Sequence, residues 1–254
     1  RASIRRTLAL YRLGLNNEGL REWQYALRAA NDQELLAAAA VAQAADLPDR
    51  AISAAERTQA LHDLSQRFPT PYRHQLQTSA QNYRLDESWV YGLIRQESRF
   101  KADIQSRAGA IGLMQLMPTT ARWAAKQAGI KDFSLTNTTH VATNLELGSY
   151  YLRHVLDSLG HPVLATAAYN AGPSRAKRWK AQQPLEGAIY AETIPFNETR
   201  DYVKKVMTNA WFYAYRLGGA NISLKNIMGT VPGKSAGIDL ADSGASVLPA
   251  PATP

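Results

Sequence analysis

Apolar residues recur along most of this chain at the three- and four-residue spacing of amphipathic helices. In the N-terminal part the spacing predicts helices over residues 4–13, 18–30, 33–45 and 48–66. Later in the chain it predicts helices over residues 73–82, 87–98, 118–128, 139–159, 162–169, 173–180 and 198–217. Few segments alternate with period two, so we expect an all-α fold with almost no sheet.

Breaks in the helical pattern predict three parts. The segment Phe68-Pro69-Thr70-Pro71 ends the first part, because each proline removes a donor and biases the preceding residue away from helix. Residues 1–71 read as stacked helical hairpins, which bury their apolar faces against neighbouring hairpins. Residues 72–219 form the main helical domain. Residues 220–254 lose the pattern, are rich in Gly, Ser, Ala and Pro, and are expected to form a low-complexity, mobile and disordered tail.

Composition narrows the class of protein only slightly. The chain has 254 residues, of which 45% are hydrophobic, enough for a substantial core. The longest apolar stretch, residues 35–45, is too short for a transmembrane segment. The chain begins with Arg rather than Met, so we expect that a longer precursor was cut, and the absence of a signal peptide carries no information on location.

The net charge of +8 permits several partners. Basic residues gather in only two places, Arg1-Arg5-Arg6 and Arg175-Lys177-Arg178-Lys180, where they form either solvated helix faces or a surface attracted to an acidic polymer such as the cell wall. No nucleic-acid motif is present, so we expect no nucleic-acid partner. Without cysteines, and with five histidines at spacings that form no ligand pair, the sequence predicts no metal site.

One carboxylate stands out as chemically useful. Val90, Leu93, Ile94 and Glu97 fall at i, i+3, i+4 and i+7, so Glu97 shares the apolar face of a helix. Burial there disfavours the charged form and raises the pKa of the acid, as a general acid at neutral pH requires. The alternative is an edge glutamate that turns to solvent or pairs with a nearby arginine.

Four motifs give this glutamate a context. They are Gln96-Glu97-Ser98, Gly112-Leu113-Met114-Gln115 with Met117-Pro118, Ala168-Tyr169-Asn170-Ala171-Gly172, and Ile194-Pro195-Phe196-Asn197-Glu198-Thr199-Arg200 with Tyr202-Val203. Together, in this order, the motifs resemble those of the soluble lytic transglycosylases. The resemblance implies a lysozyme-like, goose-type catalytic domain over residues 72–219, preceded by a helical-hairpin linker region over residues 1–71.

The resemblance also implies an activity. Lytic transglycosylases cleave the β-1,4 bond between N-acetylmuramic acid and N-acetylglucosamine in peptidoglycan and leave 1,6-anhydromuramyl ends, with one glutamate as both acid and base. Glu97 takes that role here. The implied location is the periplasm, the partner is the peptidoglycan glycan strand, and no cofactor is needed.

The matching positions imply a set of substrate-binding residues: Ser106, Gln115, Met117, Tyr169 and Glu198. Among neighbouring residues, Tyr202 is expected to line the cleft, and Ser98 to cap or orient Glu97. Asp103 is a candidate second carboxylate, although a turn or cap role is favoured. Two other functions stay open: a goose-type muramidase that delivers water to the sugar, and a non-catalytic helical module that binds the cell wall.

Overall fold

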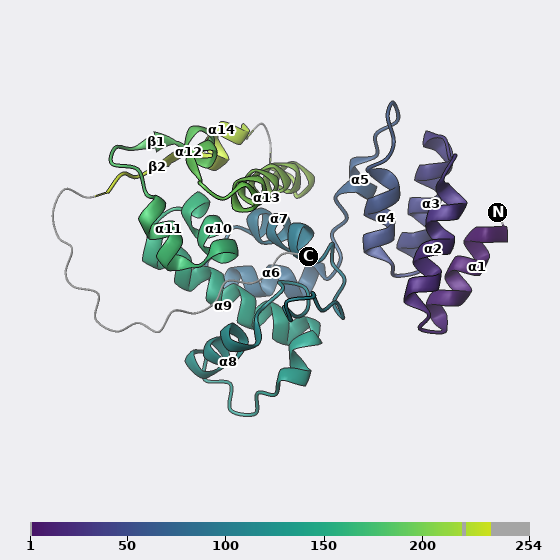
Figure 1. Ribbon diagram of the computed structural model, residues 1–254, viewed down its shortest axis with the longest axis horizontal. Coiled ribbons are helices and arrows are strands. Elements are labelled where there is room, and N and C mark those ends of the chain that lie inside the picture. Colours follow the sequence, from purple (N-terminus) through teal and green to yellow (C-terminus); the bar gives the residue numbers. More distant parts are fainter. Residues whose placement is uncertain (1, 220–221, 235–254) are drawn as a thin grey trace. The chain divides into compact units, whose positions relative to one another are not determined.

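The computed structural model describes residues 2–219 and 222–234. The chain divides into two compact units, Arg1–Pro71 and Tyr72–Pro254 (Figure 1). Both are built almost entirely of helices, so the predicted all-α class is confirmed. No helix in the described part of the chain is long and apolar enough to cross a membrane.

Unit 1 consists of two helical hairpins and a short fifth helix. Its helices are α1 (Ala2–Arg12), α2 (Asn16–Leu27), α3 (Asp32–Ala44), α4 (Pro48–Ala55) and α5 (Leu64–Arg67). Helix α1 packs on α2 and α3 packs on α4, as the predicted hairpins require. Trp23, Leu27 and Leu35 share their core with the alanines of α3 and α4, and these small side chains allow the helices to approach closely.

The single helix predicted over residues 48–66 is wrong. Helix α4 ends at Ala55, and residues 56–63 are not helical. The carboxylate of Asp32, at the start of α3, accepts hydrogen bonds from the backbone N–H groups of residues 59, 60 and 61, at 2.7 to 3.1 Å. Because these N–H groups bond to Asp32, they do not form the hydrogen bonds of a continuing helix. The contact joins residues nearly 30 positions apart, so the local spacing of apolar residues does not reveal it.

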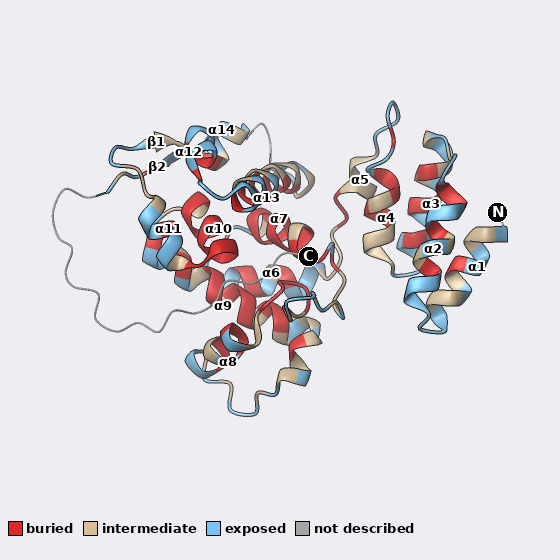
Figure 2. Ribbon diagram, viewed as in Figure 1, coloured by how far each residue is buried: buried red, intermediate tan, exposed pale blue. Residues whose placement is uncertain are grey.

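Unit 2 carries the remaining elements. They are α6 (Arg73–Asn82), α7 (Glu87–Glu97), α8 (Pro118–Gln127), η1 (Leu135–Thr139), α9 (Val141–Leu159), α10 (Pro162–Ala171), α11 (Pro173–Trp179), β1 (Leu185–Glu186), α12 (Gly187–Thr193), α13 (Asn197–Arg216), α14 (Leu224–Met228) and β2 (Thr230–Val231). Helix α7 lies at the centre of the unit and packs along α13. Its residues are almost all buried, as are the inward faces of α9, α10 and α13 (Figure 2).

Residues 222–234 differ from the expected tail. They form α14 and β2, and β2 pairs antiparallel with β1. Met228 and Val231 are buried, and the N–H of Gly187 donates to the carbonyl of Gly229 at 2.8 Å. Burial of these two side chains, packing of α14 on α12 and α13, and pairing with residues 185–186 hold this segment in place. The rest of the predicted tail, residues 220–221 and 235–254, lies outside the described residues. The functional roles given to the three parts stay predictions.

Candidate active site

Helix α7 is held against its neighbours on both sides. Asp86 caps its first turn by accepting a hydrogen bond from the N–H of Trp89 at 2.9 Å, and the Trp89 indole N–H donates to Thr166 Oγ1 of α10 at 2.9 Å. Gly92 faces α13 so closely that a Cβ there would lie 2.7 Å from the backbone nitrogen of Ala210. Only glycine permits this contact, which fixes the last turn of α7, and with it Glu97, beside α13.

The Glu97 carboxyl is enclosed, with 1% of the residue exposed. Its Oε1 accepts a hydrogen bond from the Tyr202 hydroxyl of α13 at 2.5 Å, whereas Oε2 is buried and has no hydrogen-bond partner among the described residues. Burial raises the pKa of Glu97 to about 8, and the Tyr202 hydrogen bond partly offsets that rise. The alternative of a glutamate turned to solvent is therefore wrong. Glu97 holds a proton at neutral pH, as a general acid must.

A second buried tyrosine supports the loop that precedes α8. Tyr169 of α10 is fully buried, and its hydroxyl donates to the carbonyl of Met114 at 2.8 Å. Burial, and then the charge of Glu97, hold the pKa of Tyr169 well above its usual range. Its other neighbour is Tyr151, with ring centroids 5.4 Å apart. The Tyr169 hydroxyl thus bonds to the loop that precedes α8 and not to Glu97 itself.

The loop over residues 104–117 folds back on itself through two antiparallel bridges, Gln105 to Ile111 and Ile111 to Leu116. Asn144 of α9 fixes its centre: Oδ1 accepts from the N–H of Met114 at 2.7 Å, and Nδ2 donates to the carbonyl of Ile111 at 3.0 Å. Gly112 has φ +78°, and a Cβ on it would lie 2.3 Å from Asn144 Nδ2. Glycine is thus required at this position for both its conformation and its size.

The predicted substrate-binding residues lie around this loop and on α13. Ser106 is half-buried, and its Oγ accepts from the N–H of Ala110 at 3.0 Å. Gln115 is buried at φ +45°; its Nε2 donates to the carbonyl of Gly112 at 2.7 Å, while its Oε1 has no partner in the described structure. Met117 is half-buried, directly before α8. Glu198 is exposed in the first turn of α13.

Of these residues, Tyr169 is the one whose pKa is raised in part by the charge of Glu97. Glu198 precedes Tyr202 by four residues, so it lies one turn along the same face of α13. Among the described residues no hydrogen bond joins Ser106, Gln115 or Met117 to the Glu97 carboxyl, and the substrate-binding roles of all five positions stay predictions. The unpartnered Oε2 of the protonated Glu97 carboxyl is placed to donate its proton, and the unpartnered Oε1 of Gln115 is an acceptor for a group that a ligand or water would supply.

Sequence reasoning missed one of these side chains and gave two others a different role, whereas the turn role favoured for Asp103 agrees with the structure. Tyr202 was expected only to line the cleft, and Asn144 was not identified at all. The Ser98 hydroxyl donates to the carbonyl of Ile94 and accepts from the N–H of Phe100, so it supports the turn after α7 and is not hydrogen-bonded to the Glu97 carboxyl in the described structure. Asp103 has 71% of its side chain exposed, with Lys101 at 4.0 Å, which suits a surface turn.

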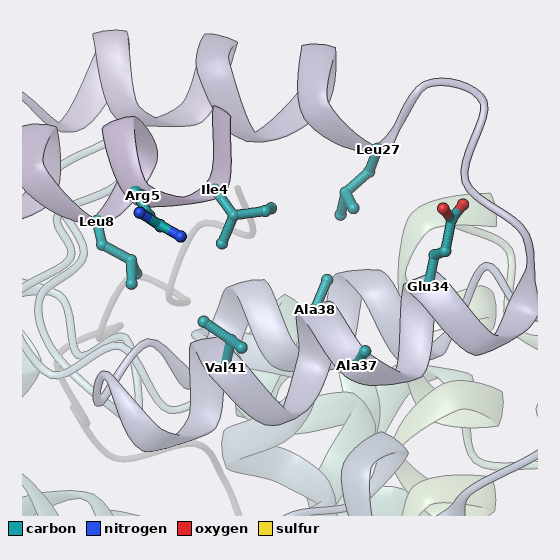
Figure 3. A pocket seen from close by; sticks show the side chains of 8 residues that line it. All are labelled: Ile4, Arg5, Leu8, Leu27, Glu34, Ala37, Ala38 and Val41. Carbon is teal, nitrogen blue, oxygen red and sulfur yellow. The ribbon is translucent and has the colours of Figure 1, made fainter. Parts of the chain in front are cut away.

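Unit 1 contains a cavity of about 460 Å³ between α1 and α3 (Figure 3). Its lining is mostly apolar: Ile4, Leu8, Leu27, Ala37, Ala38 and Val41, with Arg5 and Glu34. None of the residues around Glu97 takes part, so this cavity is separate from the candidate active site. No group of three His, Asp or Glu side chains suited to a metal ion occurs in residues 2–219 and 222–234.

Three known domain families match most of the chain. The transglycosylase SLT domain matches residues 75–190, the soluble lytic murein transglycosylase L domain matches residues 1–64, and the soluble lytic transglycosylase helical domain matches residues 193–221. The chain belongs to the soluble lytic transglycosylase family, and its second unit has the lysozyme-like fold of that family.

Individual relatives support the same family assignment. The soluble lytic murein transglycosylase of Escherichia coli K12 is 30% identical over 208 residues, which are 80% of this chain and 32% of that protein. The solved structure of an inactive mutant of the lytic transglycosylase Slt from Pseudomonas aeruginosa has a TM-score of 0.80 and 38% identity, over 87% of this chain and 36% of that one. The 70 kDa soluble lytic transglycosylase of Escherichia coli has a TM-score of 0.77 and 28% identity, over 90% of this chain and 37% of that one. The chain spans about a third of the length of these relatives.

The substitution Gly112→Ala is expected to disrupt the loop. Besides roughly 1 kcal/mol for a side chain at positive φ, the new methyl group displaces Asn144, at a further cost of about 1 to 3 kcal/mol. Gly109→Ala is the matched control, since Gly109 has φ +91° in the same loop but nothing within 4 Å of its Cβ position. Denaturant unfolding of both variants measures the difference, and equal losses would show that the Asn144 contact is unimportant.

The substitution Glu97→Gln is expected to stabilise the protein at high pH. Because the pKa of Glu97 rises from 4.5 to about 8 on folding, the acid favours the fold below pH 4.5 and loses that effect as pH rises through 8. The amide keeps an acceptor for Tyr202 and carries no charge, so the variant should gain on the order of 4 kcal/mol over the parent at pH 8 and little at pH 4. Thermal unfolding across this range measures the gain. Glu198→Gln, which removes an exposed carboxylate from the same unit, should show no such trend.

Proposed function

We propose that this chain is a peptidoglycan lytic transglycosylase that cleaves the β-1,4 bond between N-acetylmuramic acid and N-acetylglucosamine and forms 1,6-anhydromuramyl ends. The observation that carries the proposal is a single buried carboxyl, Glu97, protonated at neutral pH and hydrogen-bonded by Tyr202. The family to which the chain belongs supports the substrate, and the relatives' names support action on murein.

Glu97 acts first as the acid. Its proton passes to the glycosidic oxygen, and the bond to C1 of the muramyl residue breaks as positive charge develops on that carbon. Tyr202 keeps its hydrogen bond to Oε1 and stabilises the carboxylate that remains, so the proton on Glu97 becomes easier to release. General acid catalysis of this kind contributes about a hundred- to ten-thousandfold to the rate.

The same carboxylate then acts as the base. The acetamido oxygen of the substrate meets the positive charge on C1, and Glu97 takes the proton of the C6 hydroxyl as that oxygen closes on C1. The atoms balance without water, and Glu97 is protonated again for the next cycle. One carboxyl therefore suffices, in contrast to the carboxyl pairs of most glycosidases. This matches a site in which Asp103, the other candidate, is exposed on a turn.

The proposed substrate-binding roles follow the geometry of the site. Gln115 offers a buried acceptor oxygen, Ser106 and Met117 come from the loop that Asn144 fixes, and Glu198 lies one turn from Tyr202. The proposed location is the periplasm, where peptidoglycan lies, and no cofactor enters the reaction. A goose-type muramidase would use the same glutamate with water, so the fate of the sugar end decides between the two.

Mass spectrometry of muropeptides released from purified peptidoglycan tests the proposal. The parent should release products with 1,6-anhydromuramyl ends, one water lighter than hydrolysis products, and Glu97→Gln should release none. Reducing ends alone would establish a muramidase. If parent and variant bind the wall equally but neither cleaves it, the chain is a binding module and the proposal fails.

The substitution Tyr202→Phe should shift the pH dependence of cleavage. Loss of the hydroxyl removes the one contact that lowers the pKa of Glu97, so the alkaline fall in rate, expected near pH 8, should move to higher pH. The maximal rate should also drop about tenfold, because a hydrogen bond to a charged group is lost. Rates of muropeptide release from pH 5 to 10 measure both effects.

Tyr190→Phe is the matched control for this variant. It removes another buried tyrosine hydroxyl from unit 2, one that has no hydrogen-bond partner among the described residues. Its pH profile should equal that of the parent. An unchanged alkaline limb in Tyr202→Phe would contradict the role assigned to the Tyr202 hydrogen bond.

A further inference from the structure

A buried hydrogen bond joins α10 to α13, the helices that carry Tyr169 and Glu198. The Thr199 hydroxyl, in the first turn of α13, donates to Asn170 Oδ1, near the end of α10, at 2.7 Å. Both residues are buried, with 2% of Thr199 and 6% of Asn170 exposed. The proposed reaction uses neither side chain. We refer to Asn170 and Thr199 as the inter-helix pair.

Each member of the inter-helix pair is adjacent in sequence to a residue of the candidate site. Asn170 directly follows Tyr169, whose hydroxyl supports the loop that precedes α8. Thr199 directly follows Glu198, which has a proposed substrate-binding role. The hydrogen bond spans 29 positions of sequence, and it links the turn that carries Glu198 to the helix that carries Tyr169.

The first turn of α13 depends on contacts of this kind. No side chain caps the helix at Phe196, and helix ends without such a cap fray more readily. Arg200 donates twice to the carbonyl of Ile194, at 3.0 and 2.8 Å, and so fixes the segment that enters the helix. Thr199 supplies a second attachment, which joins the same turn to α10.

The inter-helix pair has more influence on Glu198 than on Tyr202. Tyr202 is buried one turn further along α13, and the backbone of Val206 beyond it already lies against Gly92 of α7. Glu198 is exposed in the turn that the pair anchors, so its carboxylate moves with that turn. Loss of the Thr199 donor would leave Asn170 Oδ1 buried without this hydrogen bond, and a shift of the turn would relieve that cost.

We propose that the inter-helix pair positions Glu198: the hydrogen bond from Thr199 to Asn170 holds the first turn of α13 where the Glu198 carboxylate accepts a hydrogen bond from the glycan strand. Neither Asn170 nor Thr199 touches the reacting atoms, and both act through Glu198. This inference rests on the proposed function, because the strand is the one that Glu97 cleaves.

The test measures kcat and KM for release of anhydromuropeptides with the parent, Thr199→Val and Asn170→Ala. Thr199→Val keeps the shape of the side chain and removes the donor, whereas Asn170→Ala removes the acceptor. Each should lose about tenfold in kcat/KM, mainly through a higher KM, because a contact with bound substrate is weakened. Thr199→Ser keeps the hydroxyl and should match the parent.

The decisive measurement repeats both substitutions in a Glu198→Ala background. If the pair acts through Glu198, neither substitution should cause a further loss there, because the group that the pair positions is already gone. A merely structural role would give the same loss in both backgrounds. Denaturant unfolding identifies the variants that are folded, and if one of the two does not fold, the other carries the same test.

Two further readouts complete the experiment. Thr208→Val removes a threonine hydroxyl further along α13 and should equal the parent. The alkaline limb assigned to Glu97 should not move in Thr199→Val, in contrast to Tyr202→Phe. A shifted limb, an undiminished loss in the Glu198→Ala background, or no loss in the parent background would overturn the inference while the proposed function stands. If the parent itself forms no anhydro ends, the proposed function fails, and the inference fails with it.

Discussion

The packing of α7 against α13 is the contact on which the rest of the site depends. Gly92 allows the two backbones to meet, and this brings the end of α7 to the turn of α13 that carries Tyr202. The same contact removes Glu97 from water. Its pKa rises because the charged form loses hydration, and one hydrogen bond compensates only part of that loss. A structural requirement, close helix packing, thus produces the chemical property that catalysis needs.

The burial of polar groups around Glu97 reduces the stability of the fold but suits a site for acid catalysis. One carboxyl oxygen of Glu97 and the amide oxygen of Gln115 are buried without partners in the described structure, and buried polar atoms of this kind ordinarily reduce stability by about 1 to 3 kcal/mol each. Natural proteins retain such costs mainly at functional sites. The surrounding scaffold is correspondingly well determined: both backbone groups of Met114 are engaged, the N–H by Asn144 and the carbonyl by Tyr169.

Helix α13 organises the site along its length. Tyr202 reaches inward to Glu97, and Glu198 lies one turn earlier at the surface. The two positions pass from buried to exposed within about one helical turn. Unit 1 contributes none of these side chains. Its apolar cavity is lined by residues of α1, α2 and α3, and the relatives compared above extend well beyond the length of this chain.

The sequence by itself determined most of the helices and singled out Glu97. Helix periodicity and the prolines at positions 118, 162 and 173 are local signals, and the structure places α8, α10 and α11 at those prolines. The shared apolar face of Val90, Leu93, Ile94 and Glu97 is equally local, but it left open a glutamate turned to solvent, and the family motifs were needed to favour the catalytic acid. Family motifs supplied Tyr169 and the residues of the loop.

Only the tertiary structure decided which groups meet. The bond from Tyr202 to Glu97 spans 105 positions, and Asn144 holds a loop 30 positions away. The break in residues 56–63 and the folding of residues 222–234 depend on contacts with Asp32 and with β1. Periodicity reports which face of an element is buried, but it carries no information on the partner that buries it. Long-range contacts, and the pKa of Glu97 that follows from them, therefore emerge only when the helices pack.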